Sequence, residues 1–269
     1  AKWEIAQYTI TYALDGGTNA ASNPLSYKME SADIILMPPT KTGYTFAGWT
    51  GTGLSVPTIS VTIPKGSTGD RAYTATWTIN NYTVTFNTNG GTEVANQTVS
   101  YGGKVAQPAS QTRTGYTFGG WFSDNAFANA YDFTTSTVTG DLTLYAKWTP
   151  YTYTIKFHSN DGTGNTVTQT INYDEETALT SNTFTKAGFG ISKWTTAADG
   201  TGTSYIDGQK VLNLSSTDGE VIDLYAQWQN GVNYVNVTVS GGKVSTSSAL
   251  CTSYQTVTSS TSAMSDGWY

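Results

Sequence analysis

The stretch Tyr82-Thr83-Val84-Thr85-Phe86-Asn87-Thr88-Asn89-Gly90-Gly91 decides the fold class of this chain. Its first five residues alternate between bulky and polar side chains, which is the pattern of a strand with one buried face. The Asn-Gly-Gly end supplies residues that adopt positive φ at little cost, as a tight hairpin turn requires. A strand followed at once by such a turn indicates a β protein built from short strands.

This strand and its glycine turn occur three times, and two more landmarks recur with them in fixed order. One is a Gly-aromatic segment that leads to a Trp, and the other is a closing strand that ends in a Trp. The opening Tyr returns after 71 to 74 residues and the middle Trp after 72 to 73, which identifies a tandem repeat. Because these aromatic residues recur at fixed positions, we expect them in the repeat cores: Tyr8, Trp49, Trp77, Tyr82, Tyr116, Trp121, Trp148, Tyr153, Trp194 and Trp228.

The landmarks divide the chain into repeat modules at residues 8–78, 82–149 and 153–229. Residues 1–7 are predicted to be the end of a preceding repeat or a linker, because Trp3 precedes Tyr8 by the same five residues that separate the later Trp–Tyr pairs. Residues 230–269 are a Ser/Thr-rich tail or a partial fourth repeat. Within this tail Val235, Val237 and Val239 alternate as in a strand, and they could form an assembly strand that pairs with another copy of the chain.

The composition of the chain argues against several classes of function. Charged residues make up 12 % of the 269 residues and aromatic residues 13 %, and the 49 Thr residues favour strand surfaces. With 13 Lys+Arg against 19 Asp+Glu, the chain has no dominant basic field, so we expect no nucleic-acid partner. One Cys and one His are too few for a zinc site, a disulfide framework or a Cys–His catalytic pair. No apolar run approaches the roughly 18–20 residues of a membrane helix, so membrane insertion is not expected.

Four kinds of residue remain as candidate sites. Phe122, Phe127, Tyr131 and Tyr205 lie outside the landmarks and could form an exposed aromatic patch. The Asp- and Asn-rich stretches at residues 124–132 and 160–165 could hold a weak calcium ion, although Asp and Asn also favour turns. His158 is predicted to face solvent. Cys251 has no partner in the chain, and it is either an incidental residue of the tail or the site of an intermolecular disulfide. We therefore expect no catalytic residue, no cofactor and no resident metal.

The second repeat carries the motifs of a known family. Its opening strand and turn, its segment Arg113-Thr114-Gly115-Tyr116-Thr117-Phe118 and its closing strand Leu142-Thr143-Leu144-Tyr145-Ala146-Lys147-Trp148 resemble the Listeria–Bacteroides repeat, the B-repeat of internalin-type surface proteins. The resemblance covers roughly residues 1–229. The first repeat departs from the pattern after Trp49, and the third has an insertion around residues 199–210.

The resemblance implies a mainly β fold with little helix, in which small β-grasp (ubiquitin-like) modules follow one another in an elongated array. It also implies an extracellular, bacterial cell-surface location. Repetition favours span and valency over chemistry, so we expect a non-enzymatic stalk or adhesin segment whose partner is a protein or glycan on a host or neighbouring cell. Two alternatives stay open: a self-assembling filament subunit joined by strand donation from its ends, and a carbohydrate-binding module.

Overall fold

The computed structural model describes residues 4–231 in full and the backbone of strands at residues 233–240 and 243–250. Over this part of the chain every regular element is a strand, and the structure is all-β. The predicted mainly β fold is therefore confirmed. No helix able to cross a membrane is found among the described residues.

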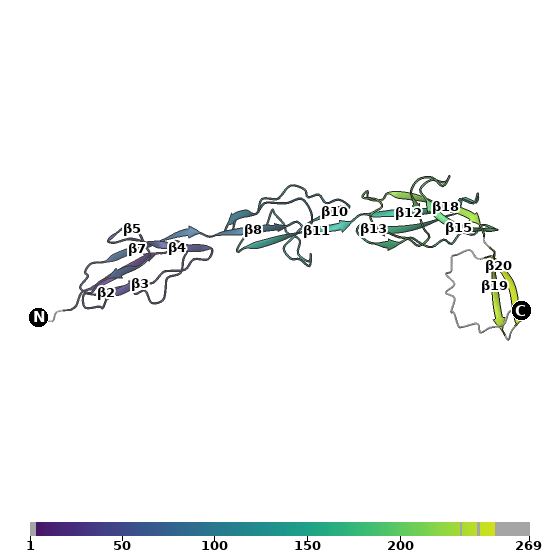
Figure 1. The fold of residues 1–269 in the computed structure, drawn as a ribbon. Helices are drawn as coiled ribbons and strands as arrows, with labels where there is room; N and C mark the ends of the chain where they lie inside the picture. The colour runs from purple at the N-terminus through teal and green to yellow at the C-terminus, as the bar shows by residue number, and fades with distance from the viewer. Residues whose placement is uncertain (1–3, 232, 241–242, 251–269) are drawn as a thin grey trace. The chain divides into compact units, whose positions relative to one another are not determined.

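The first repeat, coloured purple to blue in Figure 1, is built on a five-stranded sheet in the order β2-β1-β7-β4-β5. Its strands are β1 (Gln7–Ala13), β2 (Ser26–Lys28), β4 (Tyr44–Gly51), β5 (Leu54–Thr58) and β7 (Arg71–Ile79). Strands β1 and β2 form an antiparallel hairpin, and the closing strand β7 returns parallel to β1. The short strands β3 (Ile34–Leu36) and β6 (Val61–Ile63) pair separately. The opening hairpin and the parallel return together form the skeleton of the repeat.

The next two repeats keep this skeleton. The second has the order β10-β11-β8-β9, with β8 (Asn81–Asn87), β9 (Gln97–Ser100), β10 (Tyr116–Phe122) and β11 (Leu142–Pro150). The third has the order β13-β12-β18-β15-β16, with β12 (Thr152–His158), β13 (Thr166–Asn172), β15 (Phe189–Thr195), β16 (Ser204–Tyr205) and β18 (Val221–Asn230). Strands β14 (Thr177–Ala178) and β17 (Lys210–Val211) form a small second pair. In both repeats the closing strand is parallel to the opening one.

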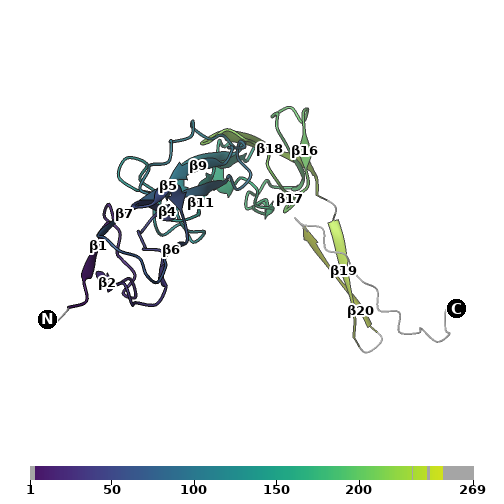
Figure 2. The ribbon, with the colours of Figure 1, turned by 90° about the vertical axis from the view of Figure 1, so that its left-hand side faces the viewer.

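The tail begins with a hairpin of β19 (Asn233–Ser240) and β20 (Lys243–Leu250), which run side by side in Figure 2. Val235, Val237 and Val239 lie on β19, which is therefore paired along one edge within its own chain. Their side chains, Cys251 and the proposed end of an earlier repeat at residues 1–3 lie outside what the structure describes.

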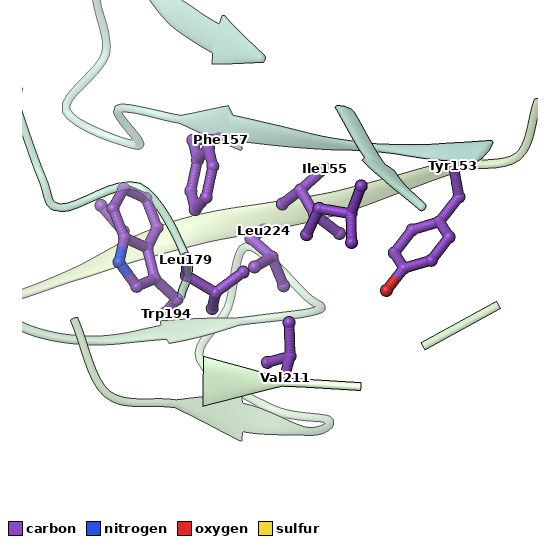
Figure 3. Close-up of a cluster of buried hydrophobic side chains, with 9 residues drawn as sticks. Tyr153, Ile155, Phe157, Leu179, Trp194, Val211 and Leu224 are labelled. Atoms are coloured by element: carbon purple, nitrogen blue, oxygen red, sulfur yellow. The ribbon is translucent and has the colours of Figure 1, made fainter. Parts of the chain in front are cut away.

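Each repeat has its own apolar core, and the core of the third is shown in Figure 3. Ile155 and Phe157 point from β12 toward Leu179 and Trp194. Phe157 and Trp194 are each 1 % exposed and meet edge to face, with ring centroids 4.8 Å apart. A unit of about 70 residues buries only a modest core, so these large aromatic side chains supply much of its stability.

The closing Trp of each repeat is bonded to the loop that follows the opening strand. The indole Nε1 atoms of Trp77, Trp148 and Trp228 donate to backbone oxygens of that loop at 3.0, 2.9 and 2.7 Å. The first and last strands of a repeat are thus joined by a side chain as well as by their ladder.

By its contacts, the chain divides into two compact units. One comprises residues 1–112 and 118–148, and the other comprises residues 113–117 and 149–269. The segment 113–117 belongs to the second repeat by sequence, yet it groups with the third.

Candidate functional site

Most of the landmark aromatic residues lie in or against the cores. Trp49, Trp121, Trp194 and Tyr153 are between 0 and 4 % exposed. Five others are half-buried and pack on the same clusters: Tyr8, Trp77, Tyr82, Trp148 and Trp228. Tyr116 departs from the expectation, since it is only half-buried and belongs to none of the three clusters. Nine of the ten recurrent rings therefore take part in core packing.

The expected exposed patch of aromatic residues is not formed. Tyr131 and Tyr205 are half-buried and pack against the cores of the second and third repeats. Phe122 and Phe127 are also half-buried, because they meet edge to face at 5.7 Å. Lys147 Nζ lies 5.2 Å from the centroid of the Phe122 ring. The four residues were chosen because they lie outside the landmarks, and a position outside the landmarks does not prevent a ring from packing on a core or on another ring.

The acidic loops are held by turn hydrogen bonds. The carboxylate of Asp124 accepts from the backbone N–H groups of Ala126, Ala128 and Asn129 at 2.8–3.1 Å. These bonds lower the pKa of Asp124, and the bond from the Ala128 N–H has the largest effect. The carboxylate oxygens therefore act as caps of the local backbone.

Asp132 and Asp161 do the same with hydroxyl groups. Asp132 accepts from the hydroxyls of Thr134 and Thr135, both at 2.6 Å, and these bonds lower its pKa to about 2. Asp161 accepts from Ser159 and a nearby Thr, which lowers its pKa to about 2 as well. Within the described residues no group of three or more His, Cys, Asp or Glu side chains is arranged to hold a metal ion.

His158 lies on β12 beside Tyr225 of β18. Its Nε2 is 2.6 Å from Oδ1 of Asp223, and its ring stacks on that of Tyr225 with centroids 4.5 Å apart. The side chain is 23 % exposed, so the histidine predicted to face solvent is held between a carboxylate and an aromatic ring.

A short turn occurs once in every repeat just before the middle Trp strand. Lys41, Arg113 and Lys186 each bridge to the aromatic residue three positions on, across a Gly with φ of +79°, +77° and +81°. The cation lies over that aromatic ring, 4.4, 3.7 and 4.9 Å from the ring centroid. We call these three segments, at residues 41–44, 113–116 and 186–189, the glycine turns. Tyr116 is the aromatic residue of the second glycine turn.

The carbonyl of each glycine turn is bonded to the residue that follows the closing strand. In the first unit, Gly43 O accepts from Asn80 N at 2.9 Å, and Asn80 O accepts from Tyr101 N at 2.8 Å. In the second unit, Tyr151 and Tyr173 repeat this two-step ladder on the Gly115 carbonyl, again at 2.8 Å per step. The third glycine turn shows its first step, from Gly231 N at 2.8 Å. The first two ladders therefore join residues of two consecutive repeats.

Polar side chains surround the second of these ladders. The hydroxyl of Tyr116 donates to Asp174 Oδ2 at 2.8 Å, and Arg113 lies 3.7 Å from the same carboxylate. The Nδ2 atom of Asn213 donates to Asp174 at 2.7 Å. These contacts lower the pKa of Asp174, and the hydrogen bond from Asn213 has the largest effect. The hydrogen bond from Tyr116 to Asp174 in turn raises the pKa of Tyr116. Tyr173 meets Tyr116 edge to face at 5.8 Å.

Sequence reasoning missed Tyr101 and Tyr173. Both stand one residue beyond the second strand of their repeat, β9 or β13. This common position could have identified the two tyrosines from the sequence, but it lies outside the three recurrent landmarks.

Comparison with known proteins identifies the repeat. The Listeria-Bacteroides repeat domain matches at residues 8–71, 82–147 and 153–227, which is more than half of the chain. The chain belongs to this family. The resemblance that the second repeat shows in sequence therefore holds for all three copies.

Three curated relatives are similar to this chain. Two are from Evansella cellulosilytica: a putative membrane protein, 31 % identical over 90 % of this chain and 36 % of the relative, and a putative Gly-rich membrane protein, 33 % identical over 90 % and 27 %. The third is internalin H of Listeria monocytogenes, 32 % identical over 53 % of this chain and 25 % of the relative. The matched region spans between 25 and 36 % of these relatives, so it corresponds to a part of each.

Proposed function

We propose that this chain is a non-enzymatic structural or adhesion segment on a bacterial surface, in which β-grasp-like modules form a stalk or adhesin array. The observation that carries the proposal is the use of the recurrent residues. Nine of the ten landmark aromatic side chains form or cover three separate cores, and the first two glycine turns are joined to the following repeat by hydrogen-bond ladders. A tandem chain of this kind supplies length and valency.

The sheet order supports β-grasp modules. In the first and third repeats the opening hairpin lies at one edge, the closing strand is central and parallel to the first strand, and the middle strands complete the other side. An opening hairpin with a parallel return beside its first strand is the skeleton of a ubiquitin-like sheet. The helix of that fold is replaced here by loops and short strand pairs in the described residues.

The relatives support a location at the cell envelope. Two are named membrane proteins and one is an internalin, and this chain corresponds to only a part of each. On this proposal the array is extracellular and its partner is a protein or glycan on a host or neighbouring cell.

Self-assembly is the second candidate, and the tail hairpin favours it. A two-stranded hairpin is marginally stable alone, so β19 and β20 gain from a further strand along an outer edge. A strand of another copy could supply it.

Light scattering and small-angle X-ray scattering on the full chain and on a version ending at Gln229 test the proposal. A compact chain of this length has a radius of gyration of about 18 Å, whereas three modules in a row reach on the order of 80–90 Å end to end. We expect both versions to be monomers with a radius of gyration well above the compact value. Polymers formed by the full chain alone would establish strand donation, and a compact monomer would refute the stalk. Saturable binding on a glycan array would instead favour the carbohydrate-binding alternative.

A further inference from the structure

We infer that consecutive repeats are coupled through an interface in which a tyrosine of one repeat packs on the glycine turn of the repeat before it. Tyr101 packs on Gly43 within the first compact unit, and Tyr173 packs on Gly115 within the second. This interface concerns how the repeats are joined, and it holds whether the array serves as a stalk, an adhesin or a filament.

The first argument is the closeness of the ring to the glycine. A Cβ added to Gly43 would lie 2.0 Å from Cδ1 of Tyr101, and one added to Gly115 would lie 2.2 Å from Cδ1 of Tyr173. The ring therefore occupies the space that any side chain at the glycine would need. The same contact at both joints, with nearly the same distances, indicates a built interface.

The second argument is that the backbone fixes the ring in place. Asn80 is the single residue between β7 and β8, and Tyr151 is the single residue between β11 and β12. Each is bonded on one side to the glycine turn and on the other to the tyrosine that covers it. Asn80 and Tyr151, which lie between the predicted repeat modules, are therefore steps of a hydrogen-bond ladder.

The third argument comes from the division of the chain into compact units. Residues 113–117, which carry the second glycine turn, group with the third repeat and apart from the rest of the second. Tyr116 of this turn contacts Tyr173 and Asp174 of the third repeat. Because the turn lies in one compact unit with the following repeat, we expect loosening of either one to loosen the other. Tandem modules with such interfaces are stabilised by their neighbours.

Hydrogen exchange measured by mass spectrometry on the full chain tests the coupling, because it reports each repeat separately. In Tyr101→Ala we expect exchange of peptides from β4 in the first repeat and from β8 and β9 in the second to rise by about tenfold, since a packed aromatic ring is lost. Peptides of the third repeat should be unchanged. Tyr101→Phe keeps the ring and should behave as the wild type. An effect confined to the second repeat, or an equal effect of the Phe variant, would overturn the inference.

Met29 offers a matched control, since it follows β2 as Tyr101 follows β9 and is 47 % exposed. Met29→Ala removes a side chain at the same position of the first repeat, and we expect exchange in all three repeats to stay within twofold of the wild type. A rise in exchange as large as that in Tyr101→Ala would show that a side chain at this position stabilises its own repeat, and it would refute coupling.

The glycines provide a second, independent test. Gly188 has nearly the same φ as Gly115, +81° against +77°, but among the described residues nothing lies within 4 Å of a Cβ built there. Gly188→Ala therefore measures backbone strain alone, while Gly115→Ala adds the collision with Tyr173. We expect exchange around Gly115→Ala to rise at least tenfold more than around Gly188→Ala. In a chain that already carries Tyr173→Ala, adding Gly115→Ala should raise exchange by no more than Gly188→Ala raises it in the wild type, which removes that excess. Equal effects of the two glycine substitutions, or an excess that survives Tyr173→Ala, would contradict the interface.

Discussion

Replacing Gly91 with alanine tests whether the closing Trp of a repeat packs directly on the opening turn. A Cβ at Gly91 would lie 2.3 Å from Cζ2 of Trp148, whose Nε1 donates to Thr88 O at 2.9 Å. The φ of Gly91 is outside the left-handed region, so the cost comes from the collision and not from backbone strain. Overpacking costs about 1–3 kcal/mol and the lost hydrogen bond about 1 kcal/mol. The lower entropy of the unfolded alanine chain offsets about 0.4–1 kcal/mol, which leaves a net loss of roughly 1–3 kcal/mol.

The assay is hydrogen exchange of peptides from β8 and β11, which the loss should accelerate by roughly 5- to 150-fold. Gly140→Ala is the matched control, because nothing lies within 4 Å of its Cβ position and its φ is also ordinary. That variant should be unchanged or more stable by up to about 1 kcal/mol. Gly17→Ala, whose Cβ would be 2.6 Å from Cζ2 of Trp77, should destabilise the first repeat in the same way. If Gly91→Ala exchanges like Gly140→Ala, the Trp is not held on the turn and the reasoning fails.

Three further predictions follow from charges and buried rings. Hydrogen bonds from Ser159 first, and from Thr163, lower the pKa of Asp161 from 3.8 to about 2. The stabilising effect of the ionised carboxylate is therefore present above pH 3.8 and is lost as the pH falls toward 2. Carboxyl titration by NMR should give the low pKa, and an ordinary value would contradict the bonds. Burial raises the pKa of Tyr12 from 10.0 to about 12, so its contribution to stability is complete below pH 10 and is lost as the pH rises to 12. In an alkaline absorbance titration the phenolate signal that Tyr12→Phe removes should develop near pH 12, and a signal already half developed near pH 10 would refute this. Trp194→Phe should destabilise its repeat by about 1 kcal/mol more than Trp49→Phe does, because the Trp194 Nε1 donates to a carboxylate at 3.0 Å while that of Trp49 is buried with no partner among the described residues. Equal losses of stability by hydrogen exchange would count against this.

The sequence predicts the inside of each repeat well. Alternation places Tyr153, Ile155 and Phe157 on one face of β12, and all three are at most 1 % exposed. The middle Trp is identified by its spacing, and Trp49, Trp121 and Trp194 are each buried. This succeeds because strand alternation and the repeat period are both local properties of the chain.

The insertion of the third repeat shows what local patterns leave out. Residues 199–210, which interrupt the repeat pattern, include β16, which pairs with β15 at the edge of the sheet as β5 pairs with β4 in the first repeat. Tyr205 thereby packs on the core, and Asp207 accepts the hydrogen bond of Trp194. An insertion in sequence is here a part of the sheet, because pairing depends on a partner that the pattern does not identify.

The joints are the largest difference between expectation and structure. Dividing the chain at the landmarks treats each repeat as closed, whereas Tyr101 and Tyr173 each pack on a glycine 58 residues earlier, in the preceding repeat. The glycine has two requirements, positive φ and room for a ring, and only the first can be read from a local turn motif. A substitution at a joint can therefore leave both neighbouring cores intact and still change how the repeats open together. The joints are therefore positions at which a single residue can alter the behaviour of the array.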